Sequence, residues 1–289
     1  MAVTAFAAAK VNLYLHITGR RADGYHLLDS LIVFPDVGDN ITAEPASGLS
    51  LEIVGPEAAS LTGRHGDNLV LRAARLLAAH TATTAGAALR LQKNLPVAAG
   101  IGGGSSDAAA AMRALTALWG LSLGEPALCD LAVRLGADLP ACLHAGPVWV
   151  GGVGERIEPA AGLPQAGILL AKPRIELPTA AVFAARSGPF GEPSRFSPMP
   201  KDAVGLAQAL MSRRNDLTGA AIGLVPEIGA VLARLERLPG ALIARMSGSG
   251  PTCFALFRDR VAAERACGRN GPFAPKPSGD DQRDLSVRP

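Results

Sequence analysis

The alternation of apolar and polar residues near the N-terminus predicts a pair of strands. From Val11 to Ile17 every second residue is apolar, a period that is typical of a half-buried strand. A turn bounded by glycines follows at residues 19–24, and a second apolar stretch begins at Leu27. Another strand is indicated at residues 49–54. The chain is therefore expected to begin with strand, turn and strand.

Helical spacing of apolar residues appears in the next part of the chain. Asn68 precedes a run of this spacing and is of the type that caps helix N-termini. Residues 89–91 alternate again and lead into a glycine run, after which the Ser-Ser-Asp sequence at 105–107 is expected to cap an alanine-rich helix. The other predicted elements are helices at 128–135, 204–210, 227–238 and 261–267, strands at 147–150, 168–171, 241–244 and 253–257, and a proline-rich loop at 187–200. Strands and helices mix without strict alternation, which favours an α+β fold over a doubly wound sheet.

The same pattern predicts how the chain is divided into domains. A length of 289 residues suits one large or two medium domains. We expect an N-terminal domain over residues 1–155, ending after the glycine-rich stretch 151–154, and a C-terminal domain over residues 156–267. Residues 268–289 are polar and rich in proline and glycine, so we predict a disordered tail there.

Composition argues against several classes of function. Hydrophobic residues make up 48% of the chain, but much of this share is alanine, and no apolar run approaches the ~18 residues that a membrane span requires. The N-terminus lacks the order of a secretory signal, so a cytoplasmic protein is expected. A net charge of +3 and an aromatic content of 4% argue against nucleic-acid binding. The cysteines form no C-x-x-C pair and the histidines no H-x-x-x-H pair, which indicates buried thiols rather than disulfides or a metal site.

The most informative segment runs from Pro96 to Ser106, where a predicted strand feeds a glycine run and then a helix. Glycine lets the backbone approach a ligand closely, and the first N–H groups of a helix, together with its dipole, form an anion site suited to phosphates. No lysine follows the glycines, so the segment is not a Walker A loop. Ser105 stands where a G-x-G-x-x-G fingerprint starting at Gly100 requires glycine. The remaining alternative is a glycine-rich connection that binds nothing.

Three segments resemble the motifs of the GHMP kinases in order and spacing. Residues 96–109 are similar to that family's phosphate-binding motif, residues 8–13 to its first motif, and residues 246–252 to its third, a glycine loop that flanks the nucleotide phosphates. The resemblance implies a two-lobed α+β fold, with an N-terminal ribosomal-protein-S5-like lobe and a C-terminal ferredoxin-like lobe. It also implies ATP as the phosphoryl donor, with Mg²⁺ arriving on the nucleotide rather than in a metal cage of the chain. The residues that it assigns to nucleotide binding are Pro96, Val97, Ala98, Ala99, Gly100, Ile101, Gly102, Gly103, Gly104, Ser105, Ser106, Asn68, Gly248 and Ser249.

A carboxylate and a lysine supply the remaining groups that a kinase requires. Asp138 lies between Gly136 and Pro140, which predicts a turn rather than a regular element. A kinase needs a carboxylate near the attacking hydroxyl and a cation near the developing charge. The resemblance assigns Asp138 as the catalytic aspartate, which accepts or orients the hydroxyl proton, and Lys10 as its partner. Taken singly, each residue is more often a turn residue or a solvated charge.

The substrate is suggested by residues 20–26, R-R-A-D-G-Y-H, which resemble the GHMP branch that acts on a cytidine-diphosphate-linked methylerythritol. The resemblance implies that Tyr25 stacks on cytosine and that His26 hydrogen-bonds its edge, roles that suit an aromatic face and an imidazole. The other substrate contacts that it implies are Asn12, Thr179 and Phe183. The implied reaction is ATP-dependent phosphorylation of the 2-hydroxyl, in the non-mevalonate route to isopentenyl diphosphate. On the residues alone, the tyrosine and the phenylalanine are also typical of a core.

Other functions remain as alternatives. A homoserine, mevalonate or galactose-type kinase of the same superfamily is disfavoured by the sequence at residues 20–26. A non-catalytic ATP or metabolite sensor on the same fold would not need both Lys10 and Asp138. A dinucleotide-binding oxidoreductase is disfavoured by the glycine spacing. The expected partner is a small-molecule substrate, bound by a monomer or homodimer without nucleic acid or membrane. Residues 215–217, Asn-Asp-Leu, also match a recurrent family motif, which we interpret as a cap for the next helix.

Overall fold

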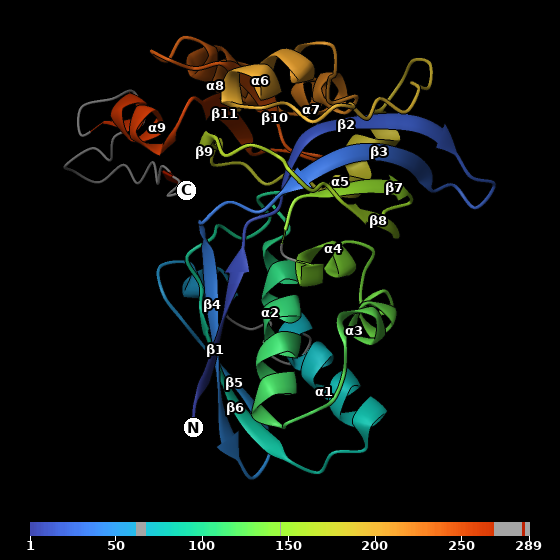
Figure 1. The fold of residues 1–289 in the computed structure, drawn as a ribbon, viewed down its shortest axis with the longest axis vertical. Coiled ribbons are helices and arrows are strands. Elements are labelled where there is room, and N and C mark those ends of the chain that lie inside the picture. The colour runs from blue at the N-terminus through green and yellow to red at the C-terminus, as the bar shows by residue number, and fades with distance from the viewer. Residues whose placement is uncertain (62–67, 145, 269–284, 287–289) are drawn as a thin grey trace. The chain divides into compact units, whose positions relative to one another are not determined.

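The computed structural model describes residues 1–61, 68–144, 146–268 and 285–286, which form two compact units (Figure 1). Unit 1 consists of the described residues of Met1–Lys10, Gly38–Val97 and Gly102–Ala145. Unit 2 consists of those of Val11–Val37, Ala98–Ile101 and Gly146–Pro289. Each unit is therefore assembled from segments that are distant in the sequence.

These units differ from the linear division that the sequence suggests. The expected boundary between residues 155 and 156 falls in the turn of a hairpin formed by β7 (Val148–Gly152) and β8 (Arg156–Pro159). β3 (His26–Val33) pairs with β7, so a strand from the first part of the chain shares a sheet with the later hairpin. Pairing of strands remote in sequence is the physical reason for the difference.

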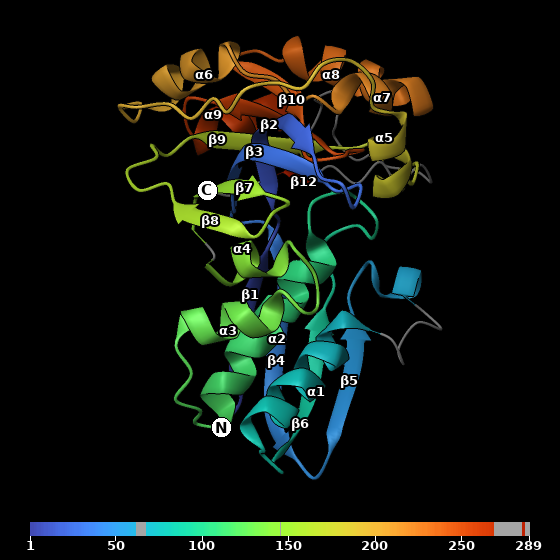
Figure 2. The same cartoon turned by 90° about the vertical axis from the view of Figure 1, so that its right-hand side faces the viewer.

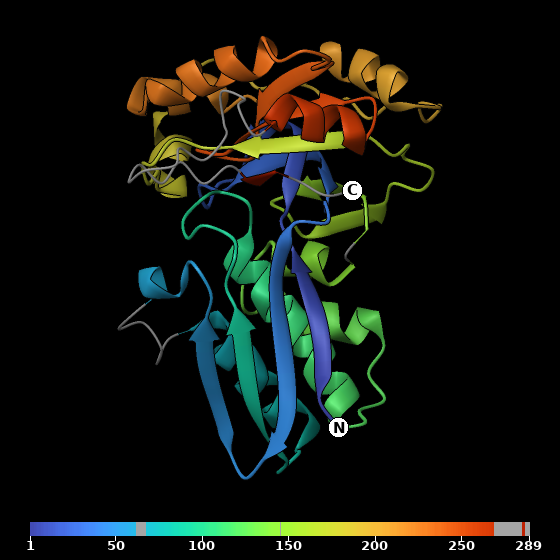
Figure 3. The same ribbon diagram turned by 90° about the vertical axis from the view of Figure 1, so that its left-hand side faces the viewer.

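Unit 1 is a four-stranded sheet with helices packed on it. Its strands are β1 (Val3–Ala8), β4 (Gly38–Ala46), β5 (Leu49–Val54) and β6 (Gly86–Gln92), and its helices are η1 (Ala58–Leu61), α1 (Leu69–Thr81), α2 (Gly103–Leu118), α3 (Glu125–Ala132) and α4 (Leu139–His144). The strand order is β1-β4-β6-β5, with the β5–β6 pair parallel and the other pairs antiparallel. Figure 2 shows α1 and α2 in front of the sheet, and Figure 3 shows its strands from the opposite side.

The helix α2 begins earlier than the sequence predicts. Its first residue is Gly103 and its N-cap is Gly102, in the left-handed region at φ +66°. The Ser-Ser-Asp sequence at 105–107 therefore lies inside the helix instead of capping it, because the two preceding glycines adopt helical backbone. Residues 108–111 are all alanine and fully buried, so the helix can lie close to the sheet.

Unit 2 contains two four-stranded sheets. The first is ordered β2-β3-β7-β8 and adds β2 (Val11–Arg20), and the second is ordered β10-β11-β9-β12, with β9 (Gly167–Ala171), β10 (Ile243–Met246), β11 (Cys253–Phe257) and β12 (Leu285–Ser286). The helices are α5 (Thr179–Ala185), α6 (Ala203–Met211), α7 (Thr218–Leu224), α8 (Glu227–Glu236) and α9 (Arg260–Cys267). Side chains of α8, α9 and the second sheet form a core together with Leu15 and Ile17 of β2.

The strand β2 departs from the half-buried strand that its alternation predicts. The polar positions Asn12, Tyr14 and His16 are as buried as the apolar ones, with exposed fractions of 3%, 0% and 4%. Tyr14 donates its hydroxyl hydrogen to Asp29 at 2.9 Å, and Asn12 donates from Nδ2 to Ser30 at 2.8 Å. Both faces of β2 can be covered because these polar groups have partners inside the unit.

Most other predicted elements are confirmed with nearly the same bounds, among them α1, α6, α8, α9, β5, β9 and β11. The strands β1, β4 and β8 were not predicted, so the chain begins with one strand more than expected; the Gly-Asp-Asn start of β4 is typical of a turn. Of the tail, the structure describes Gly268 and β12, which pairs with β9. The predicted disorder otherwise lies outside the described residues.

Two expectations from composition concern the thiols and the membrane. The four cysteines are thiols; Cys142 and Cys253 are buried, as expected, whereas Cys129 and Cys267 are only half-buried. Burial raises the pKa of Cys142 to about 11 and that of Cys253 to about 12, which keeps both thiols protonated at neutral pH. In the described part of the chain, no helix combines the length and apolar character that crossing a membrane requires.

Candidate active site

The N-terminus of α2 offers unit 1 an anion site. Its N-cap, Gly102, has no side chain with which to satisfy the first N–H groups of the helix. A Cβ atom built on Gly104 would meet no other atom of the described residues within 4 Å, so the first turn has room on that side. Free N–H groups and the positive end of the helix dipole are suited to phosphate oxygens.

Lys10 and Asp138 come together in the same unit. Lys10 follows β1, and its Nζ lies 3.2 Å from Oδ1 of Asp138, which immediately precedes α4. The lysine side chain is 9% exposed and the aspartate side chain 52%, so the carboxylate is accessible to a reactant. A Cβ atom on Gly102 would lie 3.0 Å from Cβ of Lys10, so the lysine also lies against the start of α2. The two residues predicted to form a catalytic pair are therefore in contact.

A second charged cluster lies beside the start of α2, and sequence reasoning missed it. The Nζ of Lys93 donates to Asp39 at 2.5 Å and to Asp107 at 2.7 Å. These three side chains, called the Lys93 cluster below, are between 0% and 4% exposed. The available signal was a lysine between Leu91 and Leu95, at the end of an apolar strand.

The ionisation of the Lys93 cluster is set by burial and by its own charges. Burial raises the pKa of Asp107 above its ordinary value, with Lys93 opposing this shift and Asp39 adding to it. Burial lowers the pKa of Lys93, but the two carboxylates outweigh it and raise that pKa overall. The lysine therefore stays charged at neutral pH, and Asp107 takes up a proton more readily than a solvent-exposed carboxyl group does.

In unit 2 the third-motif loop (residues 246–252) meets the part of the glycine loop that belongs to this unit. A Cβ atom on Gly100 would lie 1.9 Å from the carbonyl oxygen of Gly250, so only glycine fits there. The hydroxyl of Thr252 donates to the carbonyl of Ala99 at 2.6 Å. Two segments that the sequence assigns to nucleotide binding are thus joined by backbone contact and a buried hydrogen bond.

Asn215 holds the third-motif loop, a role beyond the helix cap predicted for it. Its Nδ2 donates to the carbonyls of Met246 at 2.8 Å and Gly248 at 2.7 Å. Its Oδ1 accepts from the backbone N–H of Leu217, the N-cap of α7, at 3.0 Å. The side chain therefore orders the approach to α7 and the loop together, and the loop contacts could not be read from a local motif.

Two residues predicted to contact the substrate lie against the same loop. The backbone N–H of Asn12 donates to Oγ of Ser247 at 3.0 Å, and a Cβ atom on Gly248 would lie 3.3 Å from Oδ1 of Asn12. The hydroxyls of Thr179 and Ser249 are 2.9 Å apart. Within unit 2, predicted substrate residues and predicted nucleotide residues are therefore direct neighbours.

His26 and Phe183 form the aromatic part of the predicted substrate site. Their ring centroids are 5.3 Å apart, with planes inclined at 33°. Tyr25 is 65% exposed. Burial and the charges of Arg20 and Arg186 lower the pKa of His26, so its imidazole is neutral at pH 7. A neutral imidazole has one donor and one acceptor to offer.

Asn68, predicted as a nucleotide contact or a helix cap, is the N-cap of α1. Its Oδ1 accepts from the backbone N–H of Val70 at 2.9 Å. This confirms the cap, and an adenine contact stays a prediction.

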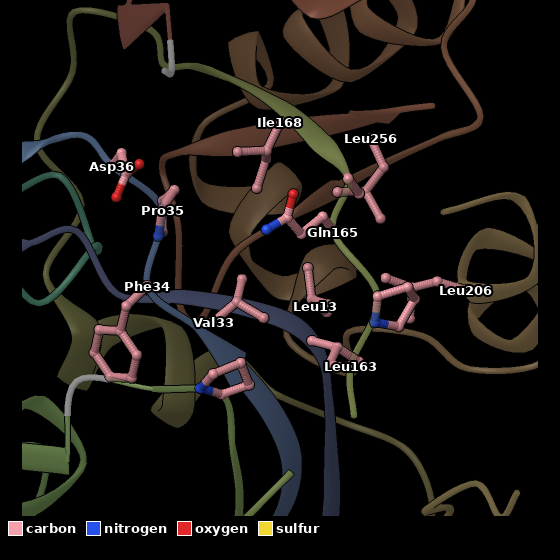
Figure 4. Close-up of a pocket in the computed structure, with 13 residues that line it drawn as sticks. Leu13, Val33, Phe34, Pro35, Asp36, Leu163, Gln165, Ile168, Leu206 and Leu256 are labelled. Atoms are coloured by element: carbon pink, nitrogen blue, oxygen red, sulfur yellow. The ribbon is translucent and has the colours of Figure 1, made fainter. Parts of the chain in front are cut away.

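A pocket of about 330 Å³ in unit 2 involves none of the residues predicted to bind nucleotide or substrate (Figure 4). Its lining is mostly apolar, with Leu13, Val33 and Ile168 among its members and Asp36 and Gln165 as polar ones. The predicted site residues do not converge there.

The donor groups at the start of α2 fit the phosphates of a nucleotide. Within residues 1–61, 68–144, 146–268 and 285–286, no group of three or more His, Cys, Asp or Glu side chains could hold a metal. The uncapped start of α2, in contrast, offers N–H groups to phosphate oxygens.

Comparisons with known proteins show the family of the chain. The family model described as GHMP kinases N terminal domain matches residues 68–146, and the model described as GHMP kinases C terminal matches residues 200–270. The 4-diphosphocytidyl-2-C-methyl-D-erythritol kinase of Paramagnetospirillum magneticum is 51% identical over 269 residues, covering 93% of this chain and 94% of the relative. The relative of the same name in Cereibacter sphaeroides strain KD131 is 53% identical over 272 residues, covering 91% and 92%.

A solved structure extends this similarity to the fold. It is the crystal structure of a 4-(cytidine 5'-diphospho)-2C-methyl-D-erythritol kinase, which is 36% identical and superposes with a TM-score of 0.74. The match covers 91% of this chain and 93% of the solved one.

Proposed function

The chain belongs to the GHMP kinase family, and we propose that it is the ATP-dependent kinase that phosphorylates the 2-hydroxyl of 4-diphosphocytidyl-2-C-methyl-D-erythritol. The observation that carries this proposal is 51% identity, over 93% of the chain, to a curated kinase of that name. The contact between Lys10 and Asp138 supports it, because it supplies the carboxylate and cation that phosphoryl transfer needs. The reaction would serve the non-mevalonate route to isopentenyl diphosphate, and we propose the cytoplasm as its compartment.

Asp138 is proposed to take the proton of the attacking hydroxyl. As the 2-hydroxyl oxygen forms its bond to the γ-phosphorus, the bond between that phosphorus and the β,γ-bridging oxygen breaks, and ADP leaves with the electron pair. The ammonium of Lys10, 3.2 Å from the carboxylate, orients Asp138 and stabilises its negative charge. The exposure of Asp138, at 52%, leaves it free to reach a hydroxyl group.

The glycine loop is proposed to hold the triphosphate. Residues 96–106 would contribute backbone N–H groups, with the start of α2 as the principal anion site. Mg²⁺, arriving with the nucleotide, neutralises part of the phosphate charge when bound. Gly248 and Ser249 of the third-motif loop are further proposed nucleotide contacts, and Asn68 is proposed as an adenine contact.

His26, Tyr25 and Phe183 are proposed to recognise the cytosine. The low pKa of His26 favours a neutral ring, which can accept from the exocyclic amine of cytosine or donate to its carbonyl. Tyr25 is exposed and can stack on a base without displacing core residues. Asn12 and Thr179 are proposed contacts for the methylerythritol or diphosphate.

The deciding experiment measures ADP release by the purified protein with ATP, Mg²⁺ and one alcohol substrate at a time. We expect turnover with 4-diphosphocytidyl-2-C-methyl-D-erythritol and none with homoserine, mevalonate or galactose. Turnover with another of these alcohols would retain the kinase and reject the substrate assignment. Nucleotide binding without any turnover would favour a non-catalytic sensor.

A variant pair isolates the cytosine contact. His26→Ala should raise KM for the cytidine substrate by about tenfold or more, because a buried hydrogen bond is lost, and leave KM for ATP unchanged. The matched control is His80→Ala, an exposed histidine at the end of α1 in the other unit. Equal increases in both KM values for His26→Ala would show a general defect and contradict its assigned role.

A further inference from the structure

The Lys93 cluster joins the two ends of the glycine loop inside unit 1. Lys93 directly follows β6, Asp39 belongs to β4, and Asp107 belongs to α2. The chain leaves β6 to form the glycine loop and returns from it into α2. One ammonium group therefore bridges the strand that precedes the loop and the helix that follows it.

Further contacts fix the loop at both ends. Oδ1 of Asp39 accepts from the backbone N–H groups of Asn94 at 2.5 Å and Leu95 at 2.8 Å, the first residues after Lys93. At the other end, a Cβ atom on Gly103 would lie 3.2 Å from Nζ of Lys93, so the ammonium lies against the first residue of α2. Lys93 therefore contacts the backbone at the start of α2, where no capping side chain is present.

We propose that Lys93 is a positioning residue for nucleotide binding, whose ammonium clamps β6 to α2 and so aims the first N–H groups of α2 at the phosphates. This inference rests on the proposed function, since it concerns how the same glycine loop binds ATP. Lys93 acts through the backbone of α2, because its side chain is 3% exposed and enclosed by two carboxylates.

The charges of the cluster fit a geometric role better than a purely stabilising one. One cation faces two carboxylates, so the formal charge is 1 − 2 = −1. Oδ1 of Asp107 has no hydrogen-bond partner among the described residues, whereas both oxygens of Asp39 accept. Buried groups with an unmet hydrogen bond contribute little to stability, and ionic clusters of this kind can instead fix one arrangement of the backbone.

The test compares Lys93→Met with the double variant Lys93→Met, Asp107→Asn. The single variant leaves two carboxylates without their cation, a formal charge of −2. The double variant returns to −1, the wild-type value, because only Asp39 stays charged. We expect the double variant to regain thermal stability but not nucleotide affinity, since neither variant has the clamp.

The readouts are Tm, KM for ATP, and the Kd of the ATP analogue adenosine 5'-(β,γ-imido)triphosphate with Mg²⁺ by calorimetry. KM and Kd should rise by about tenfold or more in both variants, while KM for the cytidine substrate stays near the wild-type value. Recovery of nucleotide affinity together with Tm in the double variant would overturn the proposal. Asp107→Asn alone keeps a hydrogen-bond acceptor for Lys93, so the Kd of the analogue should rise less in this variant, by about threefold. An unchanged Kd in Asp107→Asn would also contradict the proposal.

A matched control acts on the opposite ends of the same two elements. Trp119 at the end of α2 donates from Nε1 to the carbonyl of Gly86 at the start of β6, at 3.3 Å. Trp119→Phe should lower Tm and leave KM for ATP unchanged.

The analogue binds without turnover, so its Kd tests the role of Lys93 independently of the proposed function. If the wild-type protein binds the analogue but does not phosphorylate the cytidine substrate, the proposed function is rejected and the role of Lys93 can still be tested. Failure of the wild type to bind the analogue would overturn both.

Discussion

Two lysines lie against the start of α2, and they differ in what can reach their partners. Lys10 contacts a carboxylate that is 52% exposed, whereas Lys93 contacts two that are 0% and 4% exposed. Asp138 is therefore accessible to a reactant while it is paired with Lys10, whereas Asp39 and Asp107 are confined to the protein interior. The exposed ion pair of Lys10 is thus suited to a role in the reaction, and the buried ion pairs of Lys93 are suited to fixing the backbone.

The largest effect expected from this contrast is on turnover. Asp138→Ala removes the proposed proton acceptor and should lower kcat by about 10²- to 10⁴-fold, while nucleotide binding is largely retained. Single-turnover ADP release and calorimetric binding measure the two quantities. Asp130→Ala, an exposed aspartate on α3 in the same unit, is the control and should keep normal kcat. Normal turnover of Asp138→Ala would show that Asp138 is not the proton acceptor, and the proposed difference in role between Lys10 and Lys93 would be lost.

The next largest effect is on stability and concerns the buried lysine, Lys93. Lys93→Met should lower the free energy of unfolding by about 3–5 kcal/mol, because two carboxylates then share a buried site without a cation. Urea denaturation followed by circular dichroism provides the measurement. A loss below about 1 kcal/mol, the range of surface ion pairs, would mean that the site admits water and is not the closed cluster described.

A smaller effect is a change in how stability depends on pH. In the folded chain burial and Asp39 raise the pKa of Asp107 above its ordinary value of 3.8, against the opposing charge of Lys93. Between the unfolded and the folded pKa the folded state binds a proton that the unfolded state has lost, so stability falls as pH rises above about 4. Asp107→Asn should flatten this decline, which is at most about 1.4 kcal/mol for each pH unit. Parallel pH profiles of wild type and variant would contradict the assignment.

The smallest expected effect concerns the ion pair of Lys10 with Asp138, tested by the free energy of unfolding as for Lys93→Met. Asp138→Ala should change the free energy of unfolding by no more than about 1 kcal/mol, because a solvent-exposed carboxylate gains little from an ion pair. The same urea titration serves for both variants. A loss as large as that of Lys93→Met would indicate that Asp138 has a structural role as well.

The motifs that sequence reasoning located are local in the chain. The glycine loop, the turn at Asp138 and the cap at Asn68 each depend on a few consecutive residues, and each was found close to where the structure has it. The contact of Lys10 with Asp138 spans 128 positions, and only the resemblance to a known family brought the two together. On the residues alone, Lys10 was assigned no more than a strand start and Asp138 no more than a turn.

The features that were missed depend on contacts between remote segments. In the sequence Asp39 looks like a turn residue. In the structure it lies in β4 and is hydrogen-bonded to Lys93, 54 positions later in the chain. Asn215 looks like a helix cap, yet its amide holds carbonyls 31 and 33 positions away. The face of β2 that contains Tyr14 looks solvent-exposed, because its polar partners come from β3. The alternation of apolar and polar residues shows which side chains are polar, but not whether a partner from another segment buries them.

The discontinuity of the two units has a consequence for how the protein is made. The chain passes from one unit to the other after residues 10, 37, 97, 101 and 145, so no single cut releases either unit whole. β2 and β3 are the first strands of unit 2 to be synthesised, but the core that covers Leu15 and Ile17 includes residues as late as Ala266. Unit 2 therefore completes its core only after residue 266 has been synthesised. Its early strands stay exposed until then, which leaves incomplete chains open to aggregation and to chaperones.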